Sequence, residues 1–249
     1  MYKSKKQSGS NVIAALLMTT GLIVASLAVP VQAACPQVLP NGKAYEKLSA
    51  EWWKWAESFP VSINPLFDQT GANAYLGNQE KVFFLGGVIN ASGTVTRNIT
   101  VPAGKPLFFP VVNALWDNVT IRPPYLGGFP RSEPLSVPEL YALAAQTVES
   151  ASGIHASVDG CSIPNLSGYR AQSAPFSYRL PATDNIYQFF GIDVAGVIAP
   201  AVSDGYWLFL APLPVGEHII NFGGTFLNDP GNPSDDFTLN ITYHITVTP

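Results

Sequence analysis

Apolar and polar residues repeat at helical spacing in two segments of the chain. Between residues 45 and 59, aromatic and aliphatic side chains recur at steps of three and four and therefore share one stripe of a helix. The second segment has Ser136 as a candidate N-cap, followed by Pro138 and Glu139 in the first turn. These patterns predict a short N-terminal helix near residues 45–59 and one inserted helix near residues 138–150.

The rest of the chain shows the pattern of short strands. Segments of period two and short apolar runs are bounded by Gly, Pro or Asn. Asp159-Gly160 is a signal for a hairpin turn. Residues 205–210 are apolar on both faces, which indicates a central strand, and residues 238–248 alternate, which indicates a half-buried last strand. The predicted strands are 81–88, 94–101, 107–112, 155–158, 161–163, 176–180, 205–210, 217–222 and 238–248.

The composition also favours a β fold. The chain has 22 Pro and 21 Gly in 249 residues, and 12% of its residues are charged. An apolar chain with so many turns is typical of a sandwich or barrel of short strands. We therefore expect an all-β protein, an immunoglobulin-like or jelly-roll sandwich with a short N-terminal helix and one inserted helix. No internal repeat or linker divides residues 34–249, so a single domain is expected.

The beginning of the chain has the pattern of a signal for export. Three Lys within the first six residues precede an apolar run over 12–29, a break at Pro30 and a small residue, Ala33, at the cleavage position. We predict that residues 1–33 are a cleavable signal peptide and that the mature protein is periplasmic or secreted. The alternatives are an uncleaved membrane anchor and lipid attachment at Cys35.

The charge of the chain argues against two classes of partner. The chain has 13 Lys and Arg against 17 Asp and Glu, a formal charge of −4. Removal of residues 1–33 takes away three Lys and no acidic residue, which leaves 10 basic residues against 17 and a charge of −7. No basic run remains, and an acidic surface repels phosphate groups. We therefore expect no nucleic-acid partner, and no membrane partner after signal cleavage.

The chain contains two cysteines, Cys35 and Cys161, and both follow the predicted cleavage site. An even pair in an oxidising compartment typically forms a structural disulfide. A reactive thiol is the alternative, but the sequence places no base near either cysteine. We expect one disulfide that joins the start of the mature chain to its middle.

Several blocks of the chain resemble an uncharacterised family of exported bacterial β-rich proteins. The resemblance covers most of the mature chain, implies one continuous domain, and brings no activity, cofactor or catalytic residue. Many of the similar sequences carry a Cys pair where this chain has Ala74 and Ile99, so no disulfide is expected there. Residues 205–222 also look like the late strands of immunoglobulin-like sandwiches, which concerns the fold alone. The blocks are EWWKWAESFP (51–60), NPLFDQTG (64–71), VFFLGG (82–87), VTRNITVPAGKPLFFPVVN (95–113), VDGC (158–161), YRAQSAPFSYRLP (169–181) and SDGYWLFLAPLPVGEHIINFGGTF (203–226).

Metal-binding patterns are few. Residues 228–236 gather carboxylates and amides on one loop, and extracellular Ca²⁺ uses oxygen ligands of this kind. Asp229, Asp235 and Asp236 are therefore the candidate ligands of a calcium site. The same residue types are ordinary in turns, and the turn is the favoured interpretation. The three His residues lack the spacing of a transition-metal site, and no cofactor is expected.

Aromatic residues mark the predicted ligand-binding surface. The Pro- and Gly-rich segment 113–134 is long for a loop and apolar enough to bind a partner. Trp53 falls beside the apolar stripe of the first helix, where its indole would stack on a sugar ring or pack on the domain. Packing of the segment 113–134 over the sandwich is the favoured interpretation of its apolar residues, and ligand binding is the functional one. The candidate ligand-binding residues are Trp53, Trp116, Asp117, Asn118, Arg122, Tyr125 and Phe129.

These observations predict an exported, non-catalytic binding domain whose ligand is a glycan or a cell-surface component. One alternative is an extracellular hydrolase or lyase, which requires at least two of Asp68, Asp117 and Asp204 in one cleft. No nucleophile motif of the type G-x-S-x-G is present, and no catalytic residue is identified, so an enzyme is not favoured. A structural or envelope-assembly role is the other alternative.

Overall fold

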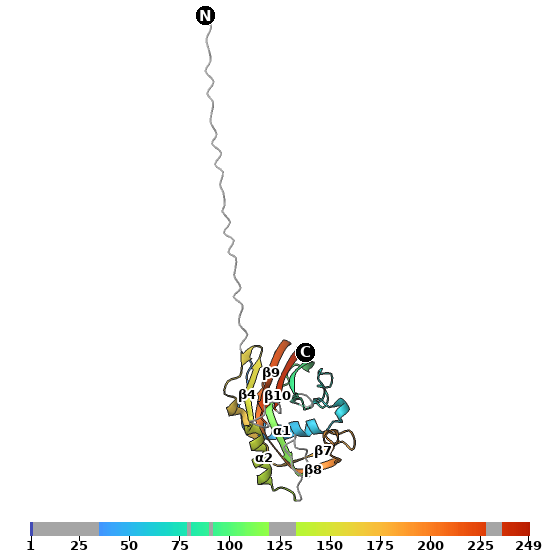
Figure 1. Ribbon diagram of the computed structural model, residues 1–249. Coiled ribbons are helices and arrows are strands. Elements are labelled where there is room, and N and C mark those ends of the chain that lie inside the picture. Colours follow the sequence, from blue (N-terminus) through green and yellow to red (C-terminus); the bar gives the residue numbers. More distant parts are fainter. Residues whose placement is uncertain (2–34, 79–80, 90–91, 120–132, 228–235) are drawn as a thin grey trace. The chain divides into compact units, whose positions relative to one another are not determined.

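The computed structural model describes residues 1, 35–78, 81–89, 92–119, 133–227 and 236–249. Residues Cys35–Pro249 form one compact unit built around two five-stranded sheets (Figure 1). Sheet A contains β1 (Phe83–Phe84), β3 (Leu107–Asp117), β6 (Arg170–Gln172), β7 (Phe176–Leu180) and β8 (Gly196–Leu210). Sheet B contains β2 (Gly93–Pro102), β4 (Ala151–Val158), β5 (Cys161–Ser162), β9 (Gly216–Phe226) and β10 (Phe237–Thr248). The described helices are α1 (Lys43–Glu57), α2 (Val137–Glu149) and α3 (Ile186–Phe189), with 3₁₀ turns η1 (Val61–Ile63) and η3 (Leu166–Tyr169).

The two sheets pack face to face over an apolar core, which confirms the predicted all-β sandwich with a few helices. Phe109 of sheet A lies against Phe222 of sheet B, with ring centroids 4.8 Å apart. In β10 the buried positions alternate with half-buried or exposed ones, and His244 is exposed. The predicted half-buried last strand is therefore confirmed, and its solvent-facing side chains lie on the outer face of sheet B.

Sheet A is buried on both of its faces. Helix α1 packs against β3, β6, β7 and β8, and helix α2 packs against β3 and β8 (Figure 1). Trp52 of α1 lies 5.6 Å from Trp207 of β8, which in turn stacks on Phe108 of β3 at 5.2 Å. Strand β8 pairs with β3 on one side and with β6 and β7 on the other. The apolar segment 205–210 is therefore a central strand, as predicted.

Local sequence signals explain the two longer helices. The apolar stripe predicted for residues 45–59 places Tyr45 and Trp52 in the core, at 0% and 1% exposure. Helix α2 begins after Ser136, whose backbone N–H and hydroxyl both donate to the Glu139 carboxylate at 2.8 and 2.6 Å. Both predicted helices are confirmed, within two residues at each end.

Several strands differ in length from the prediction: β8 begins at Gly196 and not at residue 205, and β4 and β9 are also longer than expected. Strand β3 was expected to end at residue 112 but continues to Asp117, because Asn113 to Asp117 pair with β8. Gly205 permits this close pairing, since an added Cβ there would lie 2.7 Å from the Cβ of Asn113. Conversely, the strand expected at 81–88 shrinks to the two residues of β1.

Arg97 is a charged residue in the inward-facing series of β2 and is 1% exposed. Its Nε donates to the carbonyl of Asp68 at 2.7 Å, and its Nη1 donates to the carbonyl of Gly86 at 2.7 Å and to the Tyr243 hydroxyl at 2.6 Å. A buried charge is tolerated when it is well hydrogen-bonded. The guanidinium therefore fastens the irregular chain before β2 to the sandwich.

The predicted hairpin and disulfide are both present. Asp159 and Gly160 have φ angles of 52° and 77°, as a two-residue hairpin turn with two left-handed residues requires. Strands β4 and β5 pair on either side of it. Cys161 of β5 forms the disulfide with Cys35, 126 residues earlier in the chain, with Cα atoms 5.7 Å apart.

Reduction of this disulfide is expected to destabilise the domain. Because it closes a loop of more than 100 residues, its loss is expected to lower the free energy of unfolding by about 2–5 kcal/mol. Urea unfolding of the Cys35→Ser, Cys161→Ser double variant measures the effect, with the reduced wild type as the matched control. Equal stability of the oxidised wild type and the double variant would contradict it.

His218, near the start of β9, holds the same hairpin turn. Its Nδ1 lies 2.7 Å from Oδ2 of Asp159, and its Nε2 lies 2.9 Å from the carbonyl oxygen of Pro214. Both partners are acceptors, so the imidazole satisfies them together only when both of its nitrogens carry protons. Burial acts to lower the pKa of His218, but the hydrogen bonds and the charge of Asp159 outweigh it, and the pKa is raised.

The raised pKa makes part of the stability depend on pH. A group with a raised pKa in the folded state stabilises the fold fully below its usual pKa of 6.5, and this contribution is lost as the pH rises through the higher folded value. We expect the stability advantage of wild type over His218→Gln to shrink as the pH rises through that window, measured by urea unfolding. His244→Gln, at an exposed position of β10, is the control. If the free energy of unfolding of wild type exceeded that of His218→Gln by the same amount at every pH, the proposed role of the charged His218 would be refuted.

Candidate functional site

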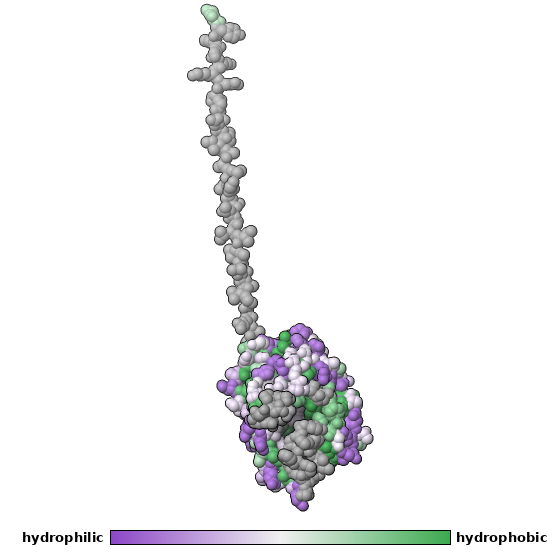
Figure 2. All heavy atoms as spheres, in the orientation of Figure 1, coloured by the Kyte–Doolittle hydropathy of each residue, from purple (hydrophilic) through white to green (hydrophobic). Residues whose placement is uncertain are grey.

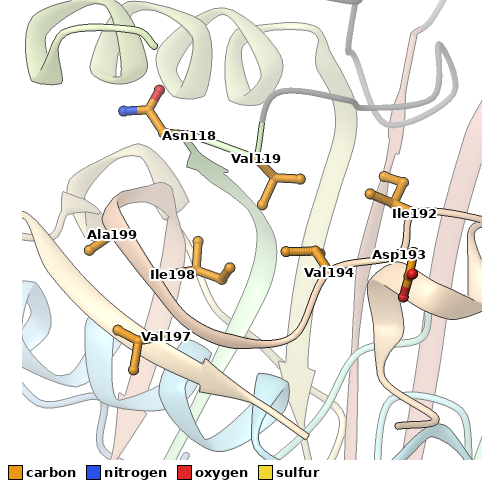
Figure 3. Close-up of a pocket in the computed structure, with 8 residues that line it drawn as sticks. All are labelled: Asn118, Val119, Ile192, Asp193, Val194, Val197, Ile198 and Ala199. Carbon is orange, nitrogen blue, oxygen red and sulfur yellow. The ribbon is translucent and has the colours of Figure 1, made fainter. Parts of the chain in front are cut away.

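A pocket of about 300 Å³ lies at the end of sheet A, where β3 ends and β8 begins. In Figure 3 the side chains of Val119, Val194 and Ile198 point toward one another, whereas that of Asn118 points away from them. Asp193 contributes the carboxylate of the lining. The volume is at the lower end of the range of small-molecule sites, which are mostly apolar with few polar groups. The pocket is lined by Asn118, Val119, Ile192, Asp193, Val194, Val197, Ile198 and Ala199.

Apolar side chains also lie in the open near this pocket. Val197, which lines it, is 58% exposed, and Phe189 of the adjoining helix α3 is 54% exposed. Phe189 contacts Phe67, with ring centroids 4.9 Å apart. Figure 2 shows hydrophobic residues gathered in patches on a visible surface that is otherwise largely hydrophilic or intermediate. Exposed apolar groups beside a concave site are typical of a binding surface.

Asn118 is hydrogen-bonded to Leu135, at the other end of the segment 119–134. Its Nδ2 donates to the carbonyl of Leu135 at 2.9 Å, and its Oδ1 accepts from the N–H of Leu135 at 2.7 Å. These two hydrogen bonds join the positions before and after the segment 119–134. The amide therefore positions the chain, and its polar atoms are already engaged within the protein.

Asp117 lies behind the pocket in a buried hydrogen-bond network and is 1% exposed. Its Oδ2 accepts from the hydroxyls of Tyr178, at 2.7 Å, and Tyr187, while its Oδ1 accepts from the N–H of Val119 at 2.8 Å. The two hydroxyls lie 3.1 Å apart. Burial, and then the neighbouring Tyr187 and Asp117, raise the pKa of Tyr178 well above its usual value, so it remains a donor.

This network ties one wall of the pocket to the other. Val119 belongs to the lining and is held by Asp117, while Tyr187 belongs to α3, which leads into the lining residues 192–194. Asn185 supports the second wall, because its Nδ2 donates to the carbonyl of Val194 at 2.7 Å. Asn185 also caps α3, with Gln188 three residues later. This Asn-x-x-Gln capping pattern indicates a helix start at Asn185, and the sequence analysis did not use it to predict α3 or the adjoining pocket wall.

The two predicted tryptophans are buried. Trp53 is 7% exposed and makes an edge contact with Trp52 at 5.0 Å. Trp116 is 3% exposed and its Nε1 donates to Oγ1 of Thr147 in α2 at 3.0 Å. Neither indole presents a free face for stacking on a sugar, and both pack in the core around sheet A. Their role as ligand contacts stays a prediction that this placement does not favour.

Five of the predicted site residues lie outside the described residues. They are Arg122, Tyr125, Phe129, Asp229 and Asp235. Asp236, the third candidate calcium ligand, directly precedes β10 and is half-buried. Within the described ranges, no group of three or more His, Cys, Asp and Glu side chains is arranged to hold a metal ion. The calcium site stays a prediction.

The three candidate catalytic carboxylates belong to separate networks. Asp204 is fully buried and forms a bidentate ion pair with Arg170, at 3.0 and 2.7 Å, which raises the pKa of Arg170. Asp68 accepts from the N–H groups of Thr70 and Asn73, both at 2.8 Å; these bonds outweigh partial burial and lower its pKa. With Asp117 bound by tyrosines, each carboxylate is held by its own donors, and such an arrangement is structural.

The tyrosine network is expected to contribute measurably to stability. Tyr187→Phe removes a donor from the buried Asp117 carboxylate and is expected to lower the free energy of unfolding by about 1.5–3 kcal/mol. Tyr75→Phe, at a residue that is 59% exposed, is the control and is expected to have little effect. Chemical unfolding measures both, and a Tyr187→Phe variant as stable as Tyr75→Phe would contradict the network.

Comparisons with known proteins do not assign this chain to a family. No family model and no curated protein matches it. A solved structure, the solution structure of Amebosin, aligns with 63% of this chain and all of its own at 12% identity, with a TM-score of 0.17. A TM-score this low carries no argument about fold or function.

Proposed function

We propose that this protein is an exported, non-catalytic binding protein that holds a small, largely apolar molecule in the pocket at the end of sheet A. The observation that carries the proposal is the convergence of Val119, Val194 and Ile198 on one pocket. A ligand would bury its apolar body against these side chains. The adjoining Val197 and Phe189 would extend the contact, since both are exposed.

The walls of the pocket are rigid in a way that suits binding. Asp117 links Val119 to Tyr187, and Asn185 holds Val194. Preorganised walls reduce the entropy that ordering a site would cost on binding. The pocket is therefore a feature of the folded domain and does not depend on a ligand to form it.

Export is supported by two independent features. The first six residues carry three Lys ahead of an apolar run and Pro30, as in a signal peptide. The Cys35–Cys161 disulfide fits a protein that folds in an oxidising compartment. Among the described residues, no helix is long and apolar enough to cross a membrane.

Six of the eight lining residues have apolar side chains, which favours a ligand with an apolar body over a glycan, while polar atoms supply about half of the exposed lining. Sugar sites combine hydrogen-bonding groups with exposed aromatic faces, whereas Trp53 and Trp116 are buried and Asn118 is engaged with Leu135. The hydrolase or lyase alternative is also less well supported, because Asp68, Asp117 and Asp204 are each held by separate donors.

The neutral fluorescent probe N-phenyl-1-naphthylamine tests the proposal. Wild type is expected to bind it saturably, and Val197→Glu is expected to weaken binding about tenfold, since placing a charge in an apolar site costs 1.4 kcal/mol or more. Val215→Glu is a matched control, because Val215 is 59% exposed, as Val197 is at 58%, and is not a lining residue of the pocket.

Two results would overturn the proposal. One is equal loss of binding in Val197→Glu and Val215→Glu, which would place the probe elsewhere. The other is no saturable binding of the probe by wild type together with binding to a soluble glycan in a parallel titration. That second result would support a glycan as the ligand, as the sequence predicted.

A further inference from the structure

We propose that the outer face of sheet B binds ice, through a regular array of hydroxyl and amide side chains. This surface is separate from the pocket, and the proposal does not depend on the pocket binding a ligand. The described helices α1 and α2 pack on sheet A, and the apolar side chains of sheet B point into the core between the sheets. The opposite face of sheet B carries the polar half of each alternating strand.

Strand pairing arranges these side chains in rows. Residues that pair directly across strands point to the same face. Thr242 of β10 pairs with Thr96 of β2 and with Asn221 of β9, and Asn221 pairs with Ser157 of β4, which pairs with Ser162 of β5. One row therefore crosses all five strands with a hydroxyl or amide on each.

Neighbouring rows repeat the same chemistry. The parallel pair β2 and β10 is in register over ten residues, so the threonines of β2 stand beside Asn240, Thr242 and Thr246 of β10. Side chains in such an array lie about 4.8 Å apart between strands and about 6.7 Å apart along a strand. The outward positions of the two strands are Thr94, Thr96, Asn98 and Thr100 in β2 and Thr238, Asn240, Thr242, His244, Thr246 and Thr248 in β10.

The array is held in place before any ligand arrives. Thr has a branched Cβ and few rotamers. Asn221 donates to Oδ1 of Asn240 at 2.9 Å and to Oγ1 of Thr242 at 3.0 Å, and Asn240 donates to Oγ1 of Thr94 at 3.2 Å. The exposed hydroxyl of Thr96 makes no hydrogen bond within the described chain and is open to water. We expect this fixed lattice of hydroxyls and methyls to order water at the spacing of the array.

The chemistry of the face disfavours the other occupants. Its outward positions hold no Lys or Arg, which nucleic acids and anionic membranes require, and no Phe, Tyr or Trp on which a sugar ring would stack. Ile219 is its one large apolar side chain with substantial exposure among the described residues, at 47%, which is too little for a protein interface with a buried apolar centre. Glu217 of β9 is the acidic residue of this face, and its carboxylate accepts from the Thr246 hydroxyl at 2.9 Å. The hydroxyl and amide side chains of the array are uncharged donors and acceptors, which suit the oxygen lattice at an ice surface.

Thermal hysteresis of the purified full chain tests the proposal. Wild type is expected to depress the freezing point below the melting point in a concentration-dependent manner and to partition into growing ice. Thr96→Lys and Thr242→Lys each place a long charged chain in the array and are expected to lose both effects while remaining folded by circular dichroism. Thr183→Lys is the control, because Thr183 is exposed in a loop away from the array.

Three outcomes would overturn the proposal. The first is the absence of hysteresis and of ice partitioning in wild type. The second is equal loss of both in Thr183→Lys. The third is sedimentation of wild type with insoluble chitin or cellulose, abolished by Thr96→Lys, without ice partitioning; this would identify the face as a polysaccharide surface. The two proposals are tested separately. Thermal hysteresis without binding of N-phenyl-1-naphthylamine would support the ice-binding face alone, and binding of the probe without hysteresis would support the pocket alone.

Discussion

The burial of sheet A on both faces is the constraint on which the rest of the structure depends. Strands β3 and β8 pack on sheet B and on α2 through one face and on α1 through the other. Trp52 of α1 makes an edge contact with Trp207 of β8, which stacks on Phe108 of β3, so that one aromatic cluster joins the helix to the strands. Because both faces are covered, any polar group placed on these strands must find its partners inside the protein.

The two carboxylates of the central strands meet this requirement, whereas Nδ2 of Asn113, Oγ of Ser203 and Nε1 of Trp207 are buried without a hydrogen-bond partner among the described residues. Asp204 is paired with Arg170, and Asp117 is bound by two tyrosines and a backbone N–H. Beyond Asp117 the paired region stops, and the next two residues, Asn118 and Val119, line the pocket. The buried carboxylate of Asp117, at the end of β3, thus also holds the two walls of the proposed binding site.

Features set by neighbouring residues were predictable from the sequence. The Asp159-Gly160 turn, the Ser136 cap and the alternation in β10 each depend on a few adjacent positions, and the disulfide followed from there being only two cysteines.

Features set by distant residues were not predictable. Asp117 was a candidate ligand residue, but its partners Tyr178 and Tyr187 lie 61 and 70 residues away. The extension of β3 depends on Gly205 of β8. Helix α3 has four residues, too few for a periodic pattern. Trp53 and Trp116 were predicted to contact a ligand because they are aromatic, but tertiary packing buries both indoles in the core.

The central claim is that an apolar molecule binds where sheet A ends, and methyl NMR tests it most directly. The measurement is a titration of N-phenyl-1-naphthylamine into protein labelled at Ile, Leu and Val methyl groups. Saturable shifts confined to Val119, Ile192, Val194, Val197 and Ile198 are the result that the structure predicts. Shifts centred on Val215 or Ile219, with the pocket methyls unchanged, would contradict it.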